Sequence, residues 1–190
     1  LSERDSLALT LYDIGAVQFG KFVLHSGKKS NFYLDLRVLV SYPDALRQVA
    51  KALAPLLGVL KYDLLAATPL AGLPIGTALC LEMNQPLIYP RKAAKSYGTG
   101  NGIEGIWRVG QSAVVIDDLV TSGDSILQTI AYLKASGIRV SDAVVLIDRE
   151  QGGVEMLSEN GYRLHSVLSV TYLFSVLQEH DRISPKQHTK

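Results

Sequence analysis

Short, wholly apolar segments alternate with longer segments of mixed polarity along most of the chain. Four segments have the length and composition of buried strands: 63–68, 86–91, 113–117 and 142–148. Helical segments lie between them, from Gly72 to Met83 and from Ser125 to Ser136, where Gly137 stops the second one. Wholly apolar strands that alternate with helices indicate βαβ units and a parallel sheet covered on both faces. We therefore expect an α/β fold, a Rossmann-like parallel sheet flanked by helices.

Further elements are expected on either side of this alternation. Ser2 followed by Asp5 is typical of a helix start, and aromatic residues around a Ser-Gly-Lys-Lys turn predict a hairpin. Pro43 favours the first turn of another helix. The expected elements are a helix over 2–17, a hairpin over 19–37, a helix over 43–57, a short helix after 148, a strand over 163–167 and a last helix from 172.

Length, composition and charge narrow the classes of function. The 190 residues fit one domain, and 47% hydrophobic with 19% charged residues indicates a soluble, folded protein. A net charge of only +1 argues against a nucleic-acid-binding module, which needs a basic face. No apolar run is long enough for a membrane span. The single cysteine, Cys80, cannot form an internal disulfide, so we expect a reducing compartment, the cytoplasm.

Parallel sheets bind their ligands at the carboxyl ends of the strands. The loops after Ala67, Pro90, Ile116 and Ile147 should therefore line one site. Of these loops, the one after Ile116 carries the strongest chemical signal.

The segment VVIDDLVTSGDS, residues 114–125, joins a buried strand to a helix through two carboxylates and a run of small residues. Backbone N–H groups of small residues at a helix N-terminus can hold a phosphate. Asp117 and Asp118 would repel that phosphate and should instead accept hydrogen bonds from a ribose diol on the same ligand. The segment predicts a ribose 5-phosphate site; the alternative is an acidic turn with a Ser/Thr helix cap.

The same segment resembles the signature of type I phosphoribosyltransferases, whose loop grips the ribose 5-phosphate of 5-phosphoribosyl-1-pyrophosphate (PRPP). The resemblance assigns PRPP contacts to the whole run: Asp117, Asp118, Leu119, Val120, Thr121, Ser122, Gly123, Asp124 and Ser125. TPLAG, residues 68–72, is similar to the family's pyrophosphate loop. Bacterial orotate enzymes carry an aromatic–basic pair where this chain has Leu70 and Ala71, so the resemblance implies backbone contacts there.

RKAAKSYGTGNGIEG, residues 91–105, is polar and glycine-rich, which is typical of an active-site loop; a solvated charge run is the alternative. The segment closely resembles the catalytic loop of orotate phosphoribosyltransferases, which reaches across a homodimer interface into the neighbouring site. The resemblance implies that Lys95 stabilises the leaving pyrophosphate, and that Arg91, Lys92 and Tyr97 make further contacts to PRPP.

FVLHSGKKSNFY, residues 22–33, resembles the N-terminal base-binding region of that family. His25 stands where the family has a lysine, and the resemblance makes it a PRPP contact; a surface turn histidine is the alternative. Phe32 and Tyr33 could pack on the flat pyrimidine or belong to the core of a strand, and core is the preferred interpretation of Phe32.

DREQGG, residues 148–153, follows the last predicted parallel strand and contains Arg149. The guanidinium group offers a planar fork of donors for carbonyl or carboxylate oxygens. The family resemblance implies that Arg149 reads orotate together with Thr121. An ion pair of Arg149 with Asp148 or Glu150 is the alternative.

Over nearly the whole chain, the resemblance implies transfer of 5-phosphoribosyl from PRPP to orotate in UMP biosynthesis. Lys95, Asp117 and Asp118 would be the catalytic residues, and Mg²⁺ would be held mainly by the substrate, with no side chain assigned as a metal ligand. The implied organisation is a single phosphoribosyltransferase domain: a small N-terminal hood and base-binding region over 1–40, a core over 41–180 and a tail over 181–190.

The DREQGG and RLHSV stretches, residues 148–153 and 163–167, resemble the phosphoribosyltransferase half of bifunctional UMP synthase, which leaves open a fusion to orotidine monophosphate decarboxylase. Two alternatives of function also remain: another type I phosphoribosyltransferase, acting on a purine or uracil, and a non-catalytic PRPP-binding regulator. The 91–105 loop and Arg149 favour the orotate enzyme. A nicotinamide-binding Rossmann enzyme is disfavoured because no Gly-x-Gly-x-x-Gly motif follows the first strand.

Overall fold

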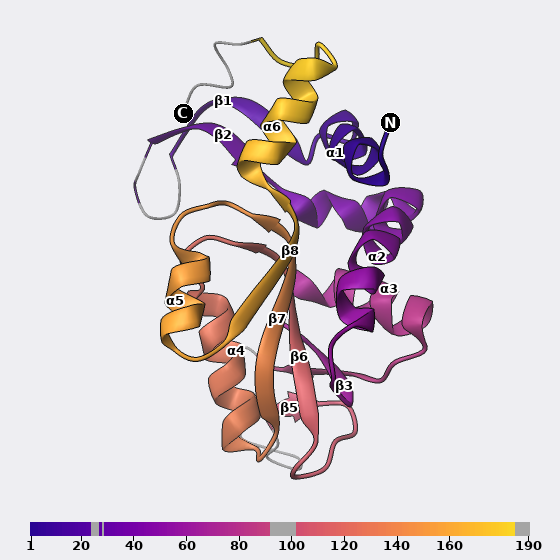
Figure 1. Ribbon diagram of the computed structural model, residues 1–190, viewed down its shortest axis with the longest axis vertical. Coiled ribbons are helices and arrows are strands. Elements are labelled where there is room, and N and C mark those ends of the chain that lie inside the picture. Colours follow the sequence, from indigo (N-terminus) through magenta and orange to yellow (C-terminus); the bar gives the residue numbers. More distant parts are fainter. Residues whose placement is uncertain (24–26, 28, 92–101, 185–190) are drawn as a thin grey trace.

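The computed structural model of the chain describes residues 1–23, 27, 29–91 and 102–184. A six-stranded sheet lies at the centre of this described part (Figure 1). Its strands are β3 (Leu64–Ala67), β4 (Leu87–Pro90), β5 (Ile103–Glu104), β6 (Ser112–Val120), β7 (Arg139–Asp148) and β8 (Arg163–Ser169). They lie in the order β5-β4-β3-β6-β7-β8; β5 pairs antiparallel with β4, and the other neighbours pair in parallel.

Helices cover both faces of this sheet. On one face lie α2 (Pro43–Gly58) and α3 (Gly72–Met83), and on the other lie α4 (Asp124–Ala135) and α5 (Gly153–Glu159) (Figure 1). Each face has its own cluster of buried apolar side chains, the first including Leu53 and Ile75 and the second including Ile126 and Ile130. Because both faces are covered, the middle of each central strand is apolar and buried, over 113–116 in β6 and 143–147 in β7, as the sequence predicted.

A separate layer, which we call the hood, lies at one end of the sheet. It contains α1 (Glu3–Asp13), the hairpin β1 (Val17–Val23) and β2 (Lys29–Leu34), the 3-10 helix η1 (Leu36–Ser41) and, from the far end of the chain, α6 (Val170–Glu179) (Figure 1). The ring of Phe174 in α6 lies 5.2 Å from the Phe19 ring and 4.9 Å from the Phe32 ring, centroid to centroid. These contacts place the hairpin and α6 side by side.

The chain reverses its direction of travel across the sheet between β3 and β6. From β3 it proceeds to β4 on one side, whereas from β6 it proceeds to β7 and β8 on the other. The loops that leave the carboxyl ends of β3 and β6 therefore diverge. Such a switch point is where open α/β sheets form a ligand-binding crevice.

The expected α/β fold is confirmed, but several predicted boundaries were wrong, and β7, for example, begins at Arg139 rather than Asp142. The first helix ends at Asp13 rather than Val17, because Gly15 adopts a φ of +79° and its N–H bonds to Tyr12. The strand expected to end at Asp117 continues to Val120, since it pairs with β7 along that whole length. The two-residue strand β5 was not predicted. The division into a 1–40 hood, a 41–180 core and a tail stays a prediction.

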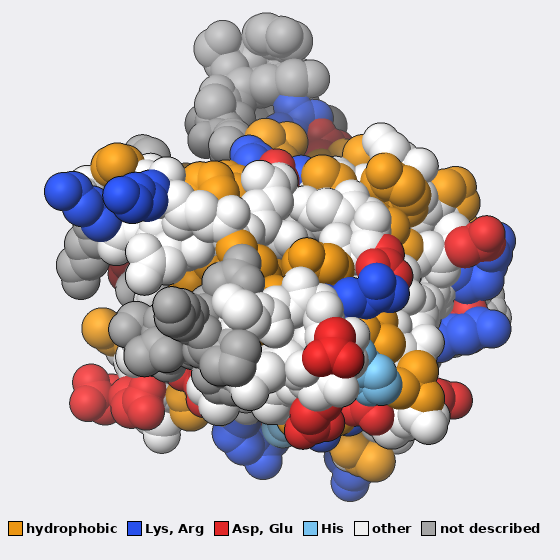
Figure 2. All heavy atoms as spheres, turned by 90° about the horizontal axis from the view of Figure 1, so that it is seen from above, with side chains coloured by type: hydrophobic (Ala, Val, Ile, Leu, Met, Phe, Trp, Pro, Cys, Tyr) orange, Lys and Arg blue, Asp and Glu red, His pale blue; other side chains and the backbone are white. Residues whose placement is uncertain are grey.

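Surface chemistry is mixed where it can be seen. On the hood end of the molecule, the described Lys and Arg side chains are interspersed with acidic and apolar ones (Figure 2). Within the described ranges, no helix combines the length and apolarity that a membrane crossing requires.

An ion cluster around the buried Asp142 joins β7 to the edge strand β8 near their amino ends, and the side chains of its partners Arg163 and His165 are 70% and 30% exposed. Asp142, only 6% exposed, accepts two hydrogen bonds of 2.9 Å from the Arg163 guanidinium, and its other contact is His165 Nε2 at 2.8 Å. The cluster satisfies its own charges, so we assign it to the stability of the sheet.

Candidate functional site

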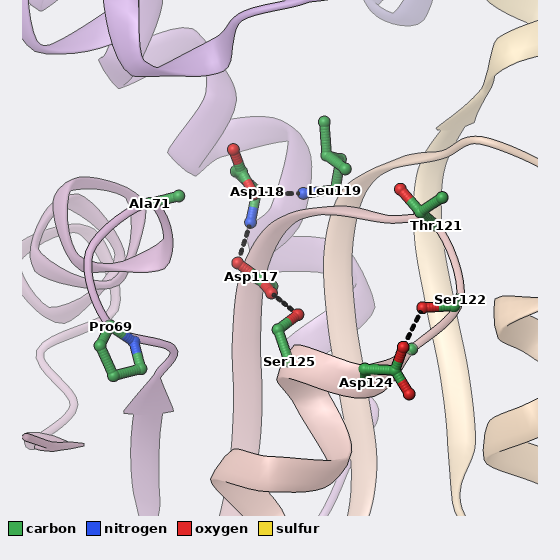
Figure 3. A pocket seen from close by; sticks show the side chains of 10 residues that line it. Pro69, Ala71, Asp117, Asp118, Leu119, Thr121, Ser122, Asp124 and Ser125 are labelled. Atoms are coloured by element: carbon green, nitrogen blue, oxygen red, sulfur yellow. Dashed lines mark hydrogen bonds between the residues drawn. The ribbon is translucent and has the colours of Figure 1, made fainter. Parts of the chain in front are cut away.

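A cavity of about 330 Å³ opens at the switch point, between the loops that follow β3 and β6 (Figure 3). The loop after β3 forms one wall, and the end of β6 with the start of α4 forms the other. The lining residues are Pro69, Ala71, Asp117, Asp118, Leu119, Thr121, Ser122, Gly123, Asp124 and Ser125. The structure thus brings together the acidic pair and the small-residue loop that the sequence singled out.

Asp117 lies at the floor of the cavity and is 4% exposed. Its carboxylate accepts three hydrogen bonds: from Thr68 Oγ1 at 2.5 Å, from the Asp118 backbone N–H at 2.9 Å and from Ser125 Oγ at 3.0 Å. Burial raises the pKa of Asp117, and these donors act in the opposite direction.

Asp118 differs from its neighbour in both exposure and partners. It is half-buried, and its carboxylate accepts a hydrogen bond of 2.8 Å from the Leu119 backbone N–H. Burial, together with the charge of Asp117, raises the pKa of Asp118 to about 7. A carboxylate with spare acceptor capacity at the cavity wall can accept hydrogen bonds from ligand hydroxyls.

The loop that leads from β6 into α4 has the form of an anion site. Gly123 has a φ of +91° and directly precedes α4, a twelve-residue helix whose N-terminus opens into the cavity. The hydroxyl of Ser122 donates to the Asp124 carboxylate at 2.6 Å, which shapes the turn. Unpaired backbone N–H groups and the positive end of the helix dipole favour a phosphate there.

Gly72 shows why the wall after β3 needs a glycine. A Cβ atom at this position would lie 2.5 Å from Thr68 Oγ1 and 2.6 Å from the carbonyl oxygen of Ile116. The first turn of α3 therefore rests directly on β6 beside Asp117. This close approach places the backbone of Pro69 and Ala71 at the cavity.

Arg149 lies on the chain directly after β7 and is 7% exposed. Its Nε and Nη2 atoms have no hydrogen-bond partner among the described residues, and its guanidinium carbon lies 5.1 Å from the centroid of the Phe32 ring. Burial lowers the pKa of Arg149. Buried donors are almost always paired in proteins, so an unpaired edge of a guanidinium indicates a missing anionic ligand.

The acidic neighbours of Arg149 are engaged elsewhere. Asp148 accepts a hydrogen bond of 2.8 Å from the Glu150 backbone N–H. Glu150 accepts hydrogen bonds from the backbone and the hydroxyl of Thr171, at 2.8 and 2.5 Å. The alternative in which either carboxylate satisfies the Nε and Nη2 atoms of Arg149 is therefore wrong.

The remaining predicted residues fall into three groups. Arg91 lines a second cavity of about 140 Å³ that shares Pro69 and Ser125 with the first, and its guanidinium pairs with Glu104. Leu70 is 63% exposed, and Tyr33 packs against Phe22 at 5.6 Å between ring centroids. The predicted contacts that lie outside the described residues are His25, Lys92, Lys95 and Tyr97.

The structure confirms the prediction for Phe32 and adds Thr68, which the sequence did not predict, to the site. Phe32 is buried against α6, which confirms the core interpretation, and its ring also packs against the Arg149 guanidinium. Thr68, 1% exposed, was not predicted as a site residue. Its signal was a lone hydroxyl at the carboxyl end of an apolar strand.

A parallel sheet with a phosphate loop, an acidic pair and a facing Thr-Pro loop at its switch point defines a type I phosphoribosyltransferase. No family model matches the chain. The orotate phosphoribosyltransferase of Pyrococcus abyssi is 37% identical over 174 residues, covering 90% of this chain and 95% of that protein. The chain belongs to the orotate phosphoribosyltransferase family.

Two similar proteins are bifunctional and longer. The bifunctional enzyme PyrF/PyrE of Nostoc sp. is 42% identical over 181 residues, which are 95% of this chain and 38% of that protein. Among solved structures, the UMP synthase of Leishmania donovani matches 98% of this chain and 41% of its own, with a TM-score of 0.91 and 40% identity. The chain thus spans about two fifths of the length of these bifunctional relatives.

Proposed function

We propose that the chain transfers the 5-phosphoribosyl group of PRPP to orotate, which releases pyrophosphate and forms orotidine 5'-monophosphate in UMP biosynthesis. The observation that carries the choice of base is the buried edge of Arg149, whose Nε and Nη2 atoms lack partners within the described part of the chain. The carboxylate of orotate offers the charge and the two oxygens that this edge needs. Thr121 and Tyr33 complete the proposed base site, and Phe32 contributes to it by packing against the Arg149 guanidinium.

PRPP is the proposed donor because the cavity suits its three parts. The loop from Thr121 to Ser125, with the N-terminus of α4, receives the 5-phosphate, and Asp118 accepts hydrogen bonds from the ribose hydroxyls. The backbone of Pro69 to Ala71 faces the pyrophosphate. A solved orotate phosphoribosyltransferase of Mycobacterium tuberculosis, 25% identical with a TM-score of 0.76, is in complex with PRPP, which supports this choice.

In the reaction, the bond between the anomeric carbon and the pyrophosphate oxygen breaks, and a bond from that carbon to the ring nitrogen of orotate forms. Negative charge grows on the departing pyrophosphate, and we assign its stabilisation to Lys95, with contacts from Arg91, Lys92 and Tyr97. His25 is a further proposed PRPP contact. The acidic pair stabilises the positive charge that develops at the anomeric carbon.

Mg²⁺ fits the cavity by the chemistry of its donors. Three carboxylates, Asp117, Asp118 and Asp124, line it, and the described lining residues include no Lys or Arg to balance them. Hard oxygen donors suit Mg²⁺, which commonly binds through substrate phosphates and retains water. The pyrophosphate and ribose oxygens would hold the ion, which supplies neutralising charge to the leaving group.

The proposal includes a homodimer in which the 91–105 loop serves the partner's site, in the cytoplasm, either as a stand-alone enzyme or fused to orotidine monophosphate decarboxylase. The loop assignment is tested by mixing two inactive variants, Lys95→Ala and Asp117→Asn/Asp118→Asn. Random exchange makes about half of the dimers mixed, each with one intact site, so roughly a quarter of wild-type activity should return. No recovery, with subunit exchange verified, would mean that the loop serves its own site.

The transfer reaction itself is tested with the purified chain, PRPP, Mg²⁺ and a panel of bases: orotate, uracil, adenine and hypoxanthine. Formation of orotidine monophosphate, with the other bases at least a hundredfold slower, is the expected result. Preference for a purine or uracil would favour another type I phosphoribosyltransferase. Binding of PRPP without any transfer would favour a regulator.

A further inference from the structure

Asp117 connects the two loops that form the walls of the cavity. Thr68, which begins the loop after β3, donates to its Oδ1 atom, and Ser125, in the first turn of α4, donates to its Oδ2 atom. The bonds span 49 and 8 positions of sequence, respectively. One carboxylate on β6 thus holds both the proposed pyrophosphate loop and the proposed phosphate loop, and Figure 3 shows its bond to Ser125.

Thr68 is tightly packed on its side of this connection. Thr68 is 1% exposed, and its backbone N–H bonds to the carbonyl of Ile116 at 2.9 Å. The start of α3 packs so tightly on Thr68 and Ile116 that Gly72 leaves no room for a Cβ atom. The packing around Thr68 therefore holds its hydroxyl at Asp117.

Asp117 and Asp118 consequently differ in what they can offer a ligand. The Asp117 carboxylate already accepts from three donors, whereas the half-buried Asp118 carboxylate accepts from the backbone N–H of Leu119. We propose that Asp118 faces the ribose, and that Thr68 is a positioning residue that acts through Asp117 to set the separation of the pyrophosphate and phosphate loops. This inference rests on the proposed function, because it takes PRPP as the ligand.

The separation of the loops matters because PRPP is bound at both ends. Its 5-phosphate and its pyrophosphate are covalently joined through one ribose, so the two anion sites must match the length of the ligand. Loss of the Thr68 hydrogen bond removes one of the links that hold that distance. PRPP affinity should fall, while the orotate site at Arg149, which belongs to another loop, should be little affected.

The test compares Thr68→Val, which removes the hydroxyl and keeps the shape, with Thr68→Ser, which keeps the hydroxyl. Because the Thr68 bond lies within the protein, its value of roughly tenfold to hundredfold is an upper limit on the affinity change, and Thr68→Val should weaken calorimetric PRPP binding by about tenfold. Thr68→Ser should stay within about threefold of wild type. Thr10→Val is the matched control, because the Thr10 hydroxyl donates within α1, to the Ser6 carbonyl.

Two further readouts separate positioning from a general structural role. The KM for PRPP should rise in Thr68→Val and return in Thr68→Ser, while the KM for orotate stays within about threefold of wild type in both variants. In a double-mutant cycle, Thr68→Val should add less than about threefold to the loss caused by Asp117→Asn. If Thr68→Val does not fold, Thr68→Cys, a weaker donor, takes its place with an intermediate loss expected.

The outcomes distinguish this inference from the proposed function. If the chain binds PRPP but does not transfer its 5-phosphoribosyl group to orotate, the proposed function alone is refuted. Three results would each overturn the positioning role alone. Thr68→Val could bind PRPP as well as Thr10→Val does, Thr68→Ser could lose as much affinity as Thr68→Val, or the affinity losses of Thr68→Val and Asp117→Asn could multiply in the double mutant. Absence of any PRPP binding by the wild-type chain would refute both.

Discussion

Arg149 gives the sharpest prediction, because substitution should affect orotate binding and stability in opposite directions. Arg149→Met removes the guanidinium and keeps an unbranched apolar side chain against Phe32. Each charge-assisted hydrogen bond is worth about 1.5–3 kcal/mol. The Nε and Nη2 atoms, which lack partners among the described residues, form the edge that can hold a carboxylate with two bonds. Loss of one bond should therefore raise the KM for orotate at least about tenfold, and loss of both should raise it about a hundredfold or more.

The ligand-free protein should respond differently. An unpaired buried charge is costly, and replacing buried ionic groups by apolar ones of similar volume is often neutral or stabilising by about 1–4 kcal/mol. For a chain of this length, each kcal/mol shifts the melting temperature by about 2–4 °C. Arg149→Met should therefore melt at the same temperature as wild type or several degrees higher, with the PRPP KM within about threefold of wild type.

Steady-state kinetics with each substrate varied in turn, and scanning calorimetry without ligands, provide the measurements. Arg149→Lys is the control that keeps the charge but loses the planar fork, and it should show much of the orotate defect without the gain in stability. A lower melting temperature together with equal rises in both KM values would refute the reasoning and make Arg149 a scaffold residue.

Three further predictions follow from the cavity walls and the sheet. Gly72→Ala should lower the melting temperature by several degrees and weaken PRPP binding, because its Cβ atom would meet the Ile116 carbonyl at 2.6 Å; Gly58→Ala, with open space around it, should do neither when both are measured by calorimetry. Burial and the charge of Asp117 raise the pKa of Asp118 to about 7, so kcat/KM for PRPP should decrease below about pH 7 as the Asp118 carboxylate is protonated. If Asp118→Asn shows the same decrease in its pH–rate profile, Asp118 is not the group that titrates. Burial raises the pKa of Asp142, but its hydrogen-bonded partners outweigh burial and hold that pKa below its ordinary value. The stabilisation is then complete above the unfolded pKa of about 3.9 and is lost as the pH falls through the folded pKa. The melting-temperature deficit of Asp142→Asn should accordingly shrink below about pH 4, and a deficit independent of pH would count against the ion cluster.

The amino-acid sequence by itself determined the elements whose signals are local. The strands β3, β6 and β7 contain runs of buried apolar residues, 64–67, 113–116 and 143–147, because both faces of the sheet are covered, and that pattern is visible in a few consecutive residues. The step from Asp117 and Asp118 into a small-residue loop and a helix is likewise contiguous. Backbone geometry at a strand-to-helix loop depends mainly on the residues within it, so the phosphate loop was predictable.

Only the tertiary structure decided which side chains meet. The Thr68 hydroxyl donates a hydrogen bond to Asp117, which is 49 positions away in the sequence, and the ring of Phe32 in the hood packs against Arg149, which follows β7. Sequence alone left Arg149 free to pair with Asp148 or Glu150, and those carboxylates instead bond to the Glu150 backbone and to Thr171. Burial and pairing are set by contacts between distant segments. A local pattern can therefore nominate a charged residue, whereas the packed fold decides whether its charge is already satisfied.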